Sequence, residues 1–261
     1  MKILILLLLV NLTLLPFSKA QEKSKIILAV FAHSDDETSI GSVLAKYAKQ
    51  HKVYVMYVVD VGDSSRIAGW PVGDSLKQIR RLEAICSCSK LGIQPPIFLG
   101  FDRLDGRKGP KEYFLRTKKL KSVLKQKIDS LKPDVLITFG PDGESGHFEH
   151  RVVSGIVTEL ILYNGWVDCY PLYYLARAKE TEPLDQLEGT GEVDKKYLNV
   201  AIHYSEEEEA TLFESLKCYL SQFRPIEIKK WKEEEAAYKD NVFYFRQFTV
   251  PKKQKTNLFE R

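Results

Sequence analysis

Residues 26–37 read IILAVFAHSDDE, an unbroken apolar run followed at once by a cluster of polar and charged side chains. A short apolar run bounded by polar residues is typical of a parallel strand that is buried on both faces. Apolar residues then recur at helical spacing, through Ile40, Val43, Leu44 and Tyr47. The segment therefore predicts a strand, a polar loop and a helix in succession.

The same succession returns along the chain, so that strands and helices alternate four times by about residue 161. Right-handed crossovers make this alternation an α/β fold, Rossmann-like and doubly wound, with a mainly parallel sheet and helices on both faces. The predicted strands are 26–31, 53–59, 97–99, 135–139, 172–175, 200–204 and 242–248. We expect no second domain, and residues 21–261 to form one unit.

The later part of the chain has a less regular pattern. Residues 205–208 read SEEE, a capping box that predicts a helix running to Leu220. Residues 182–196 are acidic and contain Pro183, Gly189 and Gly191, which predicts a loop.

The chain has 261 residues, of which 44% are hydrophobic and 28% are charged. This is the composition of an ordinary globular domain, and it excludes collagen-like, coiled-coil and wholly disordered chains. The 39 basic and 35 acidic residues leave a formal net charge of +4. Because a nucleic-acid-binding protein needs a stronger basic footprint, we expect no nucleic-acid partner.

The first twenty residues have the pattern of a secretory signal. Lys2 precedes an apolar run over residues 3–10, and residues 18–20 read SKA, a small-x-small cleavage pattern. A membrane anchor is the alternative, but the run falls short of the roughly 20 apolar residues that a spanning helix needs. We expect cleavage after Ala20, a mature chain that starts at Gln21 without a membrane anchor, and export to the periplasm or the exterior.

The chain has four cysteines, Cys86, Cys88, Cys169 and Cys218, which are too few for a disulfide scaffold. In the simplest interpretation they are small core hydrophobes. Residues two apart on a helix point to different faces, which argues against a bridge between Cys86 and Cys88. An oxidising compartment permits a Cys169–Cys218 bridge, although one sequence does not fix the connectivity.

Three of the five histidines lie in two polar clusters, each placed directly after a predicted buried strand. His33 follows the strand 26–31, and His147 and His150 follow the strand 135–139. In a sheet ordered 3-2-1-4, the connections that leave strands 1 and 4 diverge and open a crevice at the carboxyl ends of these strands. We therefore expect both clusters to meet at one place.

His33, Asp36 and His150 form a set of two imidazoles and one carboxylate. Catalytic zinc sites typically have three protein ligands and a fourth position open for water. The same ligands would also accept Fe²⁺. The sequence predicts one such ion per chain.

The residues beside these ligands suit the remaining steps of a hydrolysis. Asp35 must point away from Asp36, which suits a general base for the attacking water. His147, three residues before His150, would donate to a developing oxyanion or protonate a leaving amine, and Glu149 would orient His147 or a ligand. Taken singly, these residues also fit a helix cap and an acidic first turn, but those interpretations do not explain two such clusters at one crevice.

The two clusters also resemble known motifs. Residues 32–37, AHSDDE, resemble the AHPDDE signature of the PIG-L (LmbE-like) deacetylase superfamily, and residues 146–150, GHFEH, resemble its HPDH motif. Residues 80–84 resemble the family's arginine-bearing helix, residues 98–102 its next strand and turn, and residues 216–222 its late helix. The resemblance covers residues 25 to 225, and the two metal motifs are its specific part.

This family consists of Rossmann-like, metal-dependent amidases that remove acetyl groups from N-acetylglucosamine units linked to inositol, thiol precursors or other carriers. The resemblance implies that His33, Asp36 and His150 bind zinc and that Asp35 is the general base. It also implies that His147 stabilises the oxyanion or acts as general acid, and that Arg80 contacts the substrate. Ser34 replaces the motif proline, Glu149 replaces the motif aspartate, and Tyr219 stands where the family's late helix often has histidine.

Together these features predict an exported, zinc-dependent N-deacetylase, a hydrolase of carbon–nitrogen bonds in linear amides. Its expected substrate is an N-acetylated amino sugar of the N-acetylglucosamine type, or a glycan or small conjugate that carries one, and acetate is a product. One alternative is an amidase or deacylase that acts on another exported substrate. The other is a non-catalytic carbohydrate-binding protein on the same scaffold, although Asp35 beside a complete ligand set favours an enzyme.

Overall fold

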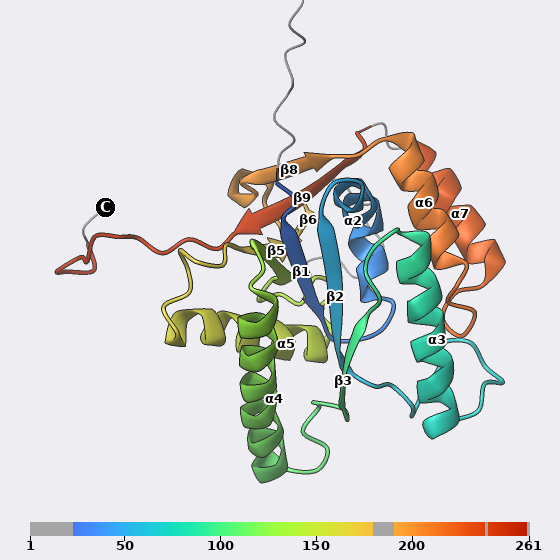
Figure 1. Cartoon of the computed structure of the whole chain (residues 1–261), viewed down its shortest axis with the longest axis horizontal. Helices are drawn as coiled ribbons and strands as arrows, with labels where there is room; N and C mark the ends of the chain where they lie inside the picture. The colour runs from blue at the N-terminus through green and yellow to red at the C-terminus, as the bar shows by residue number, and fades with distance from the viewer. Residues whose placement is uncertain (1–22, 180–190, 238–239, 260–261) are drawn as a thin grey trace, which may run out of the picture.

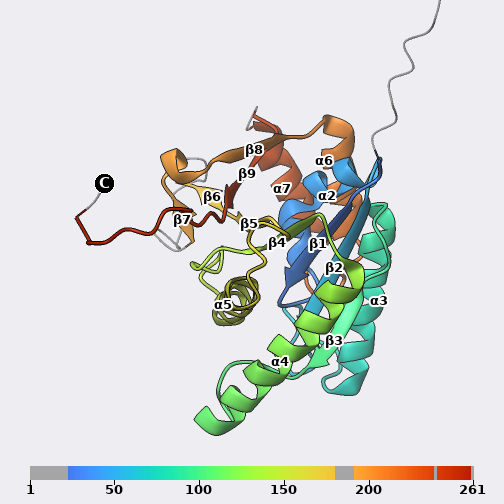
Figure 2. The same cartoon turned by 60° about the vertical axis from the view of Figure 1, so that its left-hand side comes forward.

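A seven-stranded sheet runs through the middle of the computed structural model, which describes residues 23–179, 191–237 and 240–259 (Figures 1 and 2). Its order is β3-β2-β1-β4-β5-β9-β8. The strands are β1 Ile26–Phe31, β2 Lys52–Val59, β3 Ile97–Phe101, β4 Val135–Phe139, β5 Leu172–Leu175, β8 Val200–His203 and β9 Val242–Gln247. Strands β1 to β5 pair in parallel, whereas β9 is antiparallel to both β5 and β8. The predicted doubly wound, mainly parallel sheet is confirmed.

Helices cover both faces of this sheet. On one face lie α2 Gly41–Ala48, α3 Asp74–Lys90 and α6 Glu206–Leu216, with α6 packed against both α2 and α3 and α7 Pro225–Ala237 outside α6. On the other face lie α4 Pro110–Leu131 and α5 Phe148–Tyr163. In Figure 2, α4 projects beyond the carboxyl ends of the strands. Short elements complete the fold: the 3-10 helices η1 Asp36–Ile40 and η2 Lys195–Tyr197, and the pair β6 Arg177–Ala178 and β7 Glu192–Val193.

The local signals of the sequence act largely as expected. The β1 run is buried because helices lie on both sides of it. The capping box of α6 forms in full, since the Ser205 hydroxyl accepts from the Glu208 N–H and the Glu208 carboxylate accepts from the Ser205 N–H. The predicted extension of that helix to Leu220 is wrong. The helix ends at Leu216, and Leu220 is 58% exposed.

Two other expectations differ from the structure. Helix α7 is absent from the predicted elements, because its sequence has no regular apolar stripe; Ile228 and Trp231 join the small apolar cluster that it forms with α6. Within the predicted loop 182–196, the part up to residue 190 lies outside the described residues, while β7 and the start of η2 occupy the rest. The predicted signal segment, residues 1–20, also lies outside the described residues. Within the described ranges, no helix is both long and apolar enough to cross a membrane.

The disulfide is the clearest correction to the sequence interpretation. Cys218 pairs with Cys86, not with Cys169, across 132 residues of sequence and a Cα–Cα distance of 5.7 Å. Cys169 is free and exposed, and Cys88 is free and buried. The pairing follows from the packing of α3 on α6, which brings Cys86 to the turn that follows α6. Sequence spacing contains no information about this approach.

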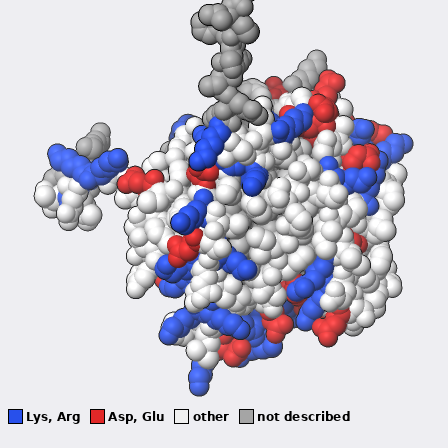
Figure 3. All heavy atoms as spheres, viewed as in Figure 1, with Lys and Arg blue, Asp and Glu red and all other residues white. Residues whose placement is uncertain are grey.

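Charges of both signs mix on the face of the molecule shown in Figure 3. Lys and Arg side chains lie beside Asp and Glu side chains there. Among the ion pairs of the described residues are Arg107–Asp105 and Lys121–Glu159. The small formal net charge of the chain is therefore distributed over this face rather than gathered into a stripe.

Candidate active site

The two polar clusters meet at the carboxyl ends of neighbouring strands. Strands β1 and β4 pair in parallel, with Ala29 opposite Ile137, and each cluster begins where its strand ends. The chain leaves β1 towards α2 on one face and leaves β4 towards α5 on the other, so the crevice between them is the topological switch point. The ring centre of His33 lies 4.9 Å from that of His147 and 5.3 Å from that of His150.

The three predicted ligands face one another in this crevice. His150 Nε2 lies 3.2 Å from Asp36 Oδ1, and His33 Nδ1 lies 3.7 Å from Asp36 Oδ2. All three residues are buried. Burial alone would raise the pKa of Asp36, but the imidazoles of His150 and His33 outweigh it and hold that pKa well below its usual value. Asp36 is therefore an ionised carboxylate between two imidazoles.

The second polar atom of each ligand is already bound to the protein. His33 Nε2 donates to Glu149 Oε2 at 2.7 Å, and His150 Nδ1 donates to the carbonyl oxygen of Gly143 at 3.0 Å. Asp36 Oδ2 accepts from the His33 backbone N–H at 2.7 Å. These bonds leave His33 Nδ1 and His150 Nε2 to face Asp36. Burial lowers the pKa of each ring, but the Asp36 carboxylate outweighs it, raising the pKa of His33 to about 9 and that of His150 above its usual value. Because a metal ion binds an unprotonated nitrogen, it would displace the protons that these two atoms share with Asp36. The donor set therefore fits a divalent metal ion.

A second donor set overlaps with the first. The ligand atoms of His33, His147 and His150 lie within 4.8 Å of one another. However, His147 Nδ1 accepts from the Glu149 N–H at 3.2 Å, because His147 caps the N-terminus of α5. The other ring nitrogen then carries the proton of the neutral ring and is a hydrogen-bond donor. Partial burial, with the charges of His33 and His150, lowers the pKa of His147 to about 4.

Asp35 lies beside the ligands with an unusual backbone. Its φ is 109°, which is rare for a residue other than glycine, and its carboxylate pairs with Arg80. The side chain is 20% exposed. Burial raises the pKa of Asp35 to about 7, although the cation of Arg80 opposes this shift. A carboxyl group with a pKa near neutrality suits proton transfer at the pH of most enzymes.

Arg80 reaches this loop from α3. Its Nη2 lies 3.1 Å from Asp35 Oδ2 and donates to the Ser34 carbonyl oxygen at 2.5 Å, while its Nε donates to Ser34 Oγ at 3.2 Å. The Ser34 hydroxyl, which stands where the motif has proline, thus adds an acceptor for the guanidinium. Arg80 is buried, so it holds the catalytic loop, and the predicted contact with substrate stays a prediction.

Glu149 connects the metal ligands to the loop after β3. Its Oε2 accepts from His33 Nε2 and from Arg103 Nη1, both at 2.7 Å, and its Oε1 accepts from the Leu104 N–H at 2.6 Å. Burial alone would raise the pKa of Glu149, but the bonds to His33, Leu104 and Arg103 lower it to about 2. Glu149 contacts His147 through its backbone N–H and His33 through its carboxylate, and its expected role in orienting His147 or a ligand stays a prediction.

Sequence reasoning missed several residues of this site. Arg103 and Leu104 follow β3 in a loop that has no ligand spacing, so only their approach to Glu149 reveals them. Tyr219, in the position where the family's late helix often has histidine, is fully buried, and its hydroxyl donates to Glu37 Oε1 at 2.7 Å. Nothing in the sequence links residues 182 positions apart.

Comparisons with known proteins agree with this geometry. Residues 28–161 match the family described as PIG-L: GlcNAc-PI de-N-acetylase. A 1D-myo-inositol 2-acetamido-2-deoxy-alpha-D-glucopyranoside deacetylase of Mycolicibacterium vanbaalenii is 24% identical over 192 residues, which cover 67% of this chain and 67% of that protein. The corresponding deacetylase of Rhodococcus erythropolis is 29% identical over 156 residues, 53% of each chain. The chain therefore spans between half and two thirds of the length of these relatives.

Solved structures show the same fold. The N,N'-diacetylchitobiose deacetylase from Pyrococcus horikoshii, complexed with its inhibitor, superposes with a TM-score of 0.59 at 17% identity, over 87% of this chain and 84% of that chain. At identities this low the similarity shows the fold alone. The architecture is thus shared with proteins that bear the name deacetylase.

Proposed function

Because the chain belongs to the PIG-L (GlcNAc-PI de-N-acetylase) family, we propose that it hydrolyses the acetamide of an N-acetylated amino sugar conjugate and releases acetate. The named relatives act on sugars that bear a 2-acetamido group. The observation that carries the proposal is the position of Asp35. Its carboxylate lies outside the ligand set and pairs with Arg80, beside the ligand atoms of His33, Asp36 and His150 in one crevice. A carbohydrate-binding protein would need neither the base nor the ligands.

We assign a divalent metal, preferably zinc, to His33, Asp36 and His150, with Fe²⁺ as the other candidate. When bound there, the metal supplies Lewis-acid chemistry, polarising the water and the acetamide carbonyl. The residues around it do the rest. Glu149 keeps the His33 ring in place, and the Gly143 carbonyl oxygen does so for His150.

Proton transfer in this mechanism belongs to Asp35 and His147. Asp35 accepts a proton from the attacking water and passes it to the departing nitrogen, so that one acetate and one free amine result. His147, neutral because its pKa is about 4, donates its N–H to the oxyanion that develops on the carbonyl oxygen. Arg80 restrains the Asp35 carboxylate through their ion pair.

The decisive experiment measures acetate release from a panel of substrates. The panel contains N-acetylglucosaminyl-inositol, N,N'-diacetylchitobiose and peptidoglycan fragments, and each is tested with the parent, with Asp35→Asn and with Asp134→Asn. Asp134 is a matched control because its carboxylate accepts from the Ile26 N–H at the opposite end of the sheet. We expect the Asp35→Asn variant to keep its metal and lose about a hundredfold or more in kcat, the scale of a missing general base.

Two results would contradict the proposal. Absence of acetate release by the metal-loaded parent from every substrate would exclude a deacetylase of this class. Turnover of Asp35→Asn at the parent rate would leave the metal site standing but remove Asp35 as the base.

We further propose that the protein is exported, on the basis of the apolar run and the SKA pattern at residues 18–20. N-terminal sequencing of the protein recovered outside the producing cells should begin at Gln21. An intact Met1 on exported protein would refute cleavage.

A further inference from the structure

A third carboxylate of the motif, Glu37, lies behind the catalytic loop and takes no part in the proposed mechanism. It is completely buried. Its Oε1 accepts from Ser87 Oγ at 2.5 Å and from the Tyr219 hydroxyl at 2.7 Å, and its Oε2 accepts from the Asp35 backbone N–H at 3.2 Å. One carboxylate thus joins α3 and the turn after α6 to the backbone of the catalytic base.

The bond to the Asp35 N–H matters because this backbone is held in a rare conformation. A φ of 109° at an aspartate is unfavourable and persists only where neighbouring contacts enforce it. The other contacts come from Thr38, whose N–H and hydroxyl both donate to the Asp35 carbonyl oxygen, at 3.0 and 2.6 Å. Glu37 therefore binds the backbone N–H of Asp35, and Thr38 binds its carbonyl oxygen.

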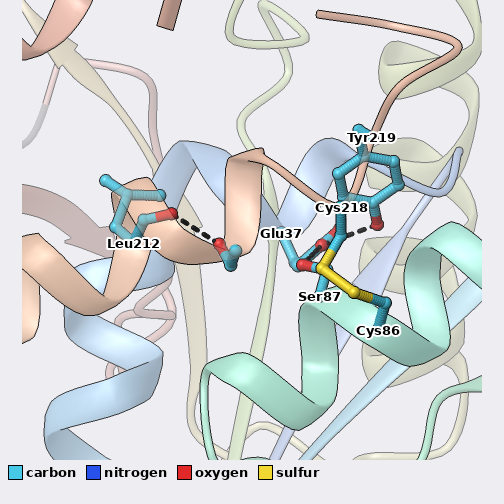
Figure 4. Close-up of a disulfide and its surroundings, with 7 residues drawn as sticks. Glu37, Cys86, Ser87, Leu212, Cys218 and Tyr219 are labelled. Carbon is cyan, nitrogen blue, oxygen red and sulfur yellow. Dashed lines mark hydrogen bonds between the residues drawn. A yellow bond between two sulfur atoms is a disulfide. The ribbon is translucent and has the colours of Figure 1, made fainter. Parts of the chain in front are cut away.

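Three hydroxyl groups bind Glu37, those of Ser87, Tyr57 and Tyr219, and two of them lie next to the disulfide. Ser87 follows Cys86 on α3, and Tyr219 follows Cys218 in the turn after α6 (Figure 4). Figure 4 shows both side chains turned towards the Glu37 carboxylate, with the sulfur–sulfur bond beside them. The covalent link keeps these two donors together, although 132 residues of sequence separate the two cysteines.

We propose that Ser87 and Tyr219, held together by the Cys86–Cys218 disulfide, are positioning residues that fix the backbone of Asp35 through the buried carboxylate of Glu37. This inference rests on the proposed function for the role of Asp35 as the base. The carboxylate of Asp35 moves with its backbone, so loss of either hydroxyl should displace the base without removing it. An error of about 1 Å in such a group can cost up to roughly a hundredfold in rate.

The first test removes one hydroxyl at a time and keeps the packing. Tyr219→Phe retains the buried ring, and Tyr204→Phe is its matched control, because the Tyr204 hydroxyl donates to Glu235 Oε1 at 2.9 Å away from the crevice. We expect Tyr219→Phe to lower kcat about fivefold to tenfold, with KM and metal content within twofold of the parent, since the loss concerns the transition state. Tyr204→Phe should leave both constants unchanged.

A double-mutant cycle shows whether the effect passes through Glu37. An amide has a single accepting oxygen, so Glu37→Gln cannot serve both the Asp35 N–H and the hydroxyls. If the hydroxyl acts through Glu37, Tyr219→Phe should have little further effect on kcat in a Glu37→Gln background. An equal fall in both backgrounds would overturn the proposal, as would a kcat of Tyr219→Phe that equals that of Tyr204→Phe.

Hydrogen exchange gives a readout that does not depend on activity. Peptides that contain Asp35 should exchange their amide protons faster in Tyr219→Phe and in Ser87→Ala than in the parent, whereas Tyr204→Phe should match the parent. Unchanged exchange in both variants would overturn the inference. Failure of the parent to release acetate would instead count against the proposed function, and the exchange rates would still decide whether this network holds the loop.

Discussion

The Cys86–Cys218 bridge closes a loop of 132 residues, and its removal should lower the stability of the protein substantially. In the chain-entropy model a disulfide acts by restricting the unfolded chain, and a loop of this length corresponds to about 5 kcal/mol at 25 °C. Losses measured for native disulfides are commonly about 2–5 kcal/mol, so 5 kcal/mol is the upper end of the expectation. The matching change is the double substitution Cys86→Ser with Cys218→Ser.

The assay is unfolding in guanidinium chloride and by heat, for the parent, the double serine variant and Cys169→Ser. Cys169 is free and exposed, so its substitution controls for the loss of a sulfur atom alone. We expect Tm of the double variant to fall by about 4–20 °C, from about 2–4 °C per kcal/mol for a chain of this size. The denaturant m-value should rise, because the unfolded chain without the cross-link exposes more surface. Cys169→Ser should unfold like the parent.

Thiol titration of the unfolded protein separates two ways in which this reasoning can fail. The parent should show two reactive thiols, those of Cys88 and Cys169. Four thiols in protein purified without reductant would show that the bridge is not formed. Two thiols, together with equal unfolding midpoints and m-values for the parent and the double variant, would refute the argument from loop entropy.

Two further predictions concern the pH dependence and the metal. Asp35 must be deprotonated to act, so kcat should rise with pH through the Asp35 pKa of about 7. Arg80→Met removes the cation that opposes the raised pKa of Asp35, so the rise in kcat should move to higher pH. The control is Arg81→Met, which should leave the rise in place because Arg81 pairs with Asp60. A shift to lower pH in Arg80→Met would contradict this assignment. Elemental analysis of protein purified without chelator should find about one divalent ion per chain in the parent and none in His150→Ala. Undiminished metal in His150→Ala would remove that residue from the ligand set. Glu149→Asp should keep the ion but bind it about 10–100-fold more weakly, because the shorter side chain cannot bind His33 and the loop after β3 at the same time.

Local sequence patterns are enough to predict the alternation of strands and helices and the edge of the sheet where the candidate site lies. An unbroken apolar run such as residues 26–31 suits a strand buried on both faces, and His33, which follows this strand, must lie at the carboxyl edge of the sheet. The spacing of His33 and Asp36, three residues apart, is a local property, so their proximity could also be predicted. These features can be predicted without knowing any contact between residues distant in sequence, given the rule that parallel sheets bind ligands at the topological switch point.

The partners of these residues depend on how distant segments pack together. The pairing of Cys86 with Cys218, the bond of Tyr219 to Glu37 and the reach of Glu149 to the Leu104 N–H all join segments that are far apart in sequence. Such contacts depend on how α3, α6 and the loop after β3 pack on the sheet, and the periodicity of a single segment carries no record of that packing. The physical reason is that hydrophobic patterning specifies which face of each element is buried, whereas hydrogen bonds and disulfides require positions defined to within a few tenths of an ångström, which only the assembled core provides.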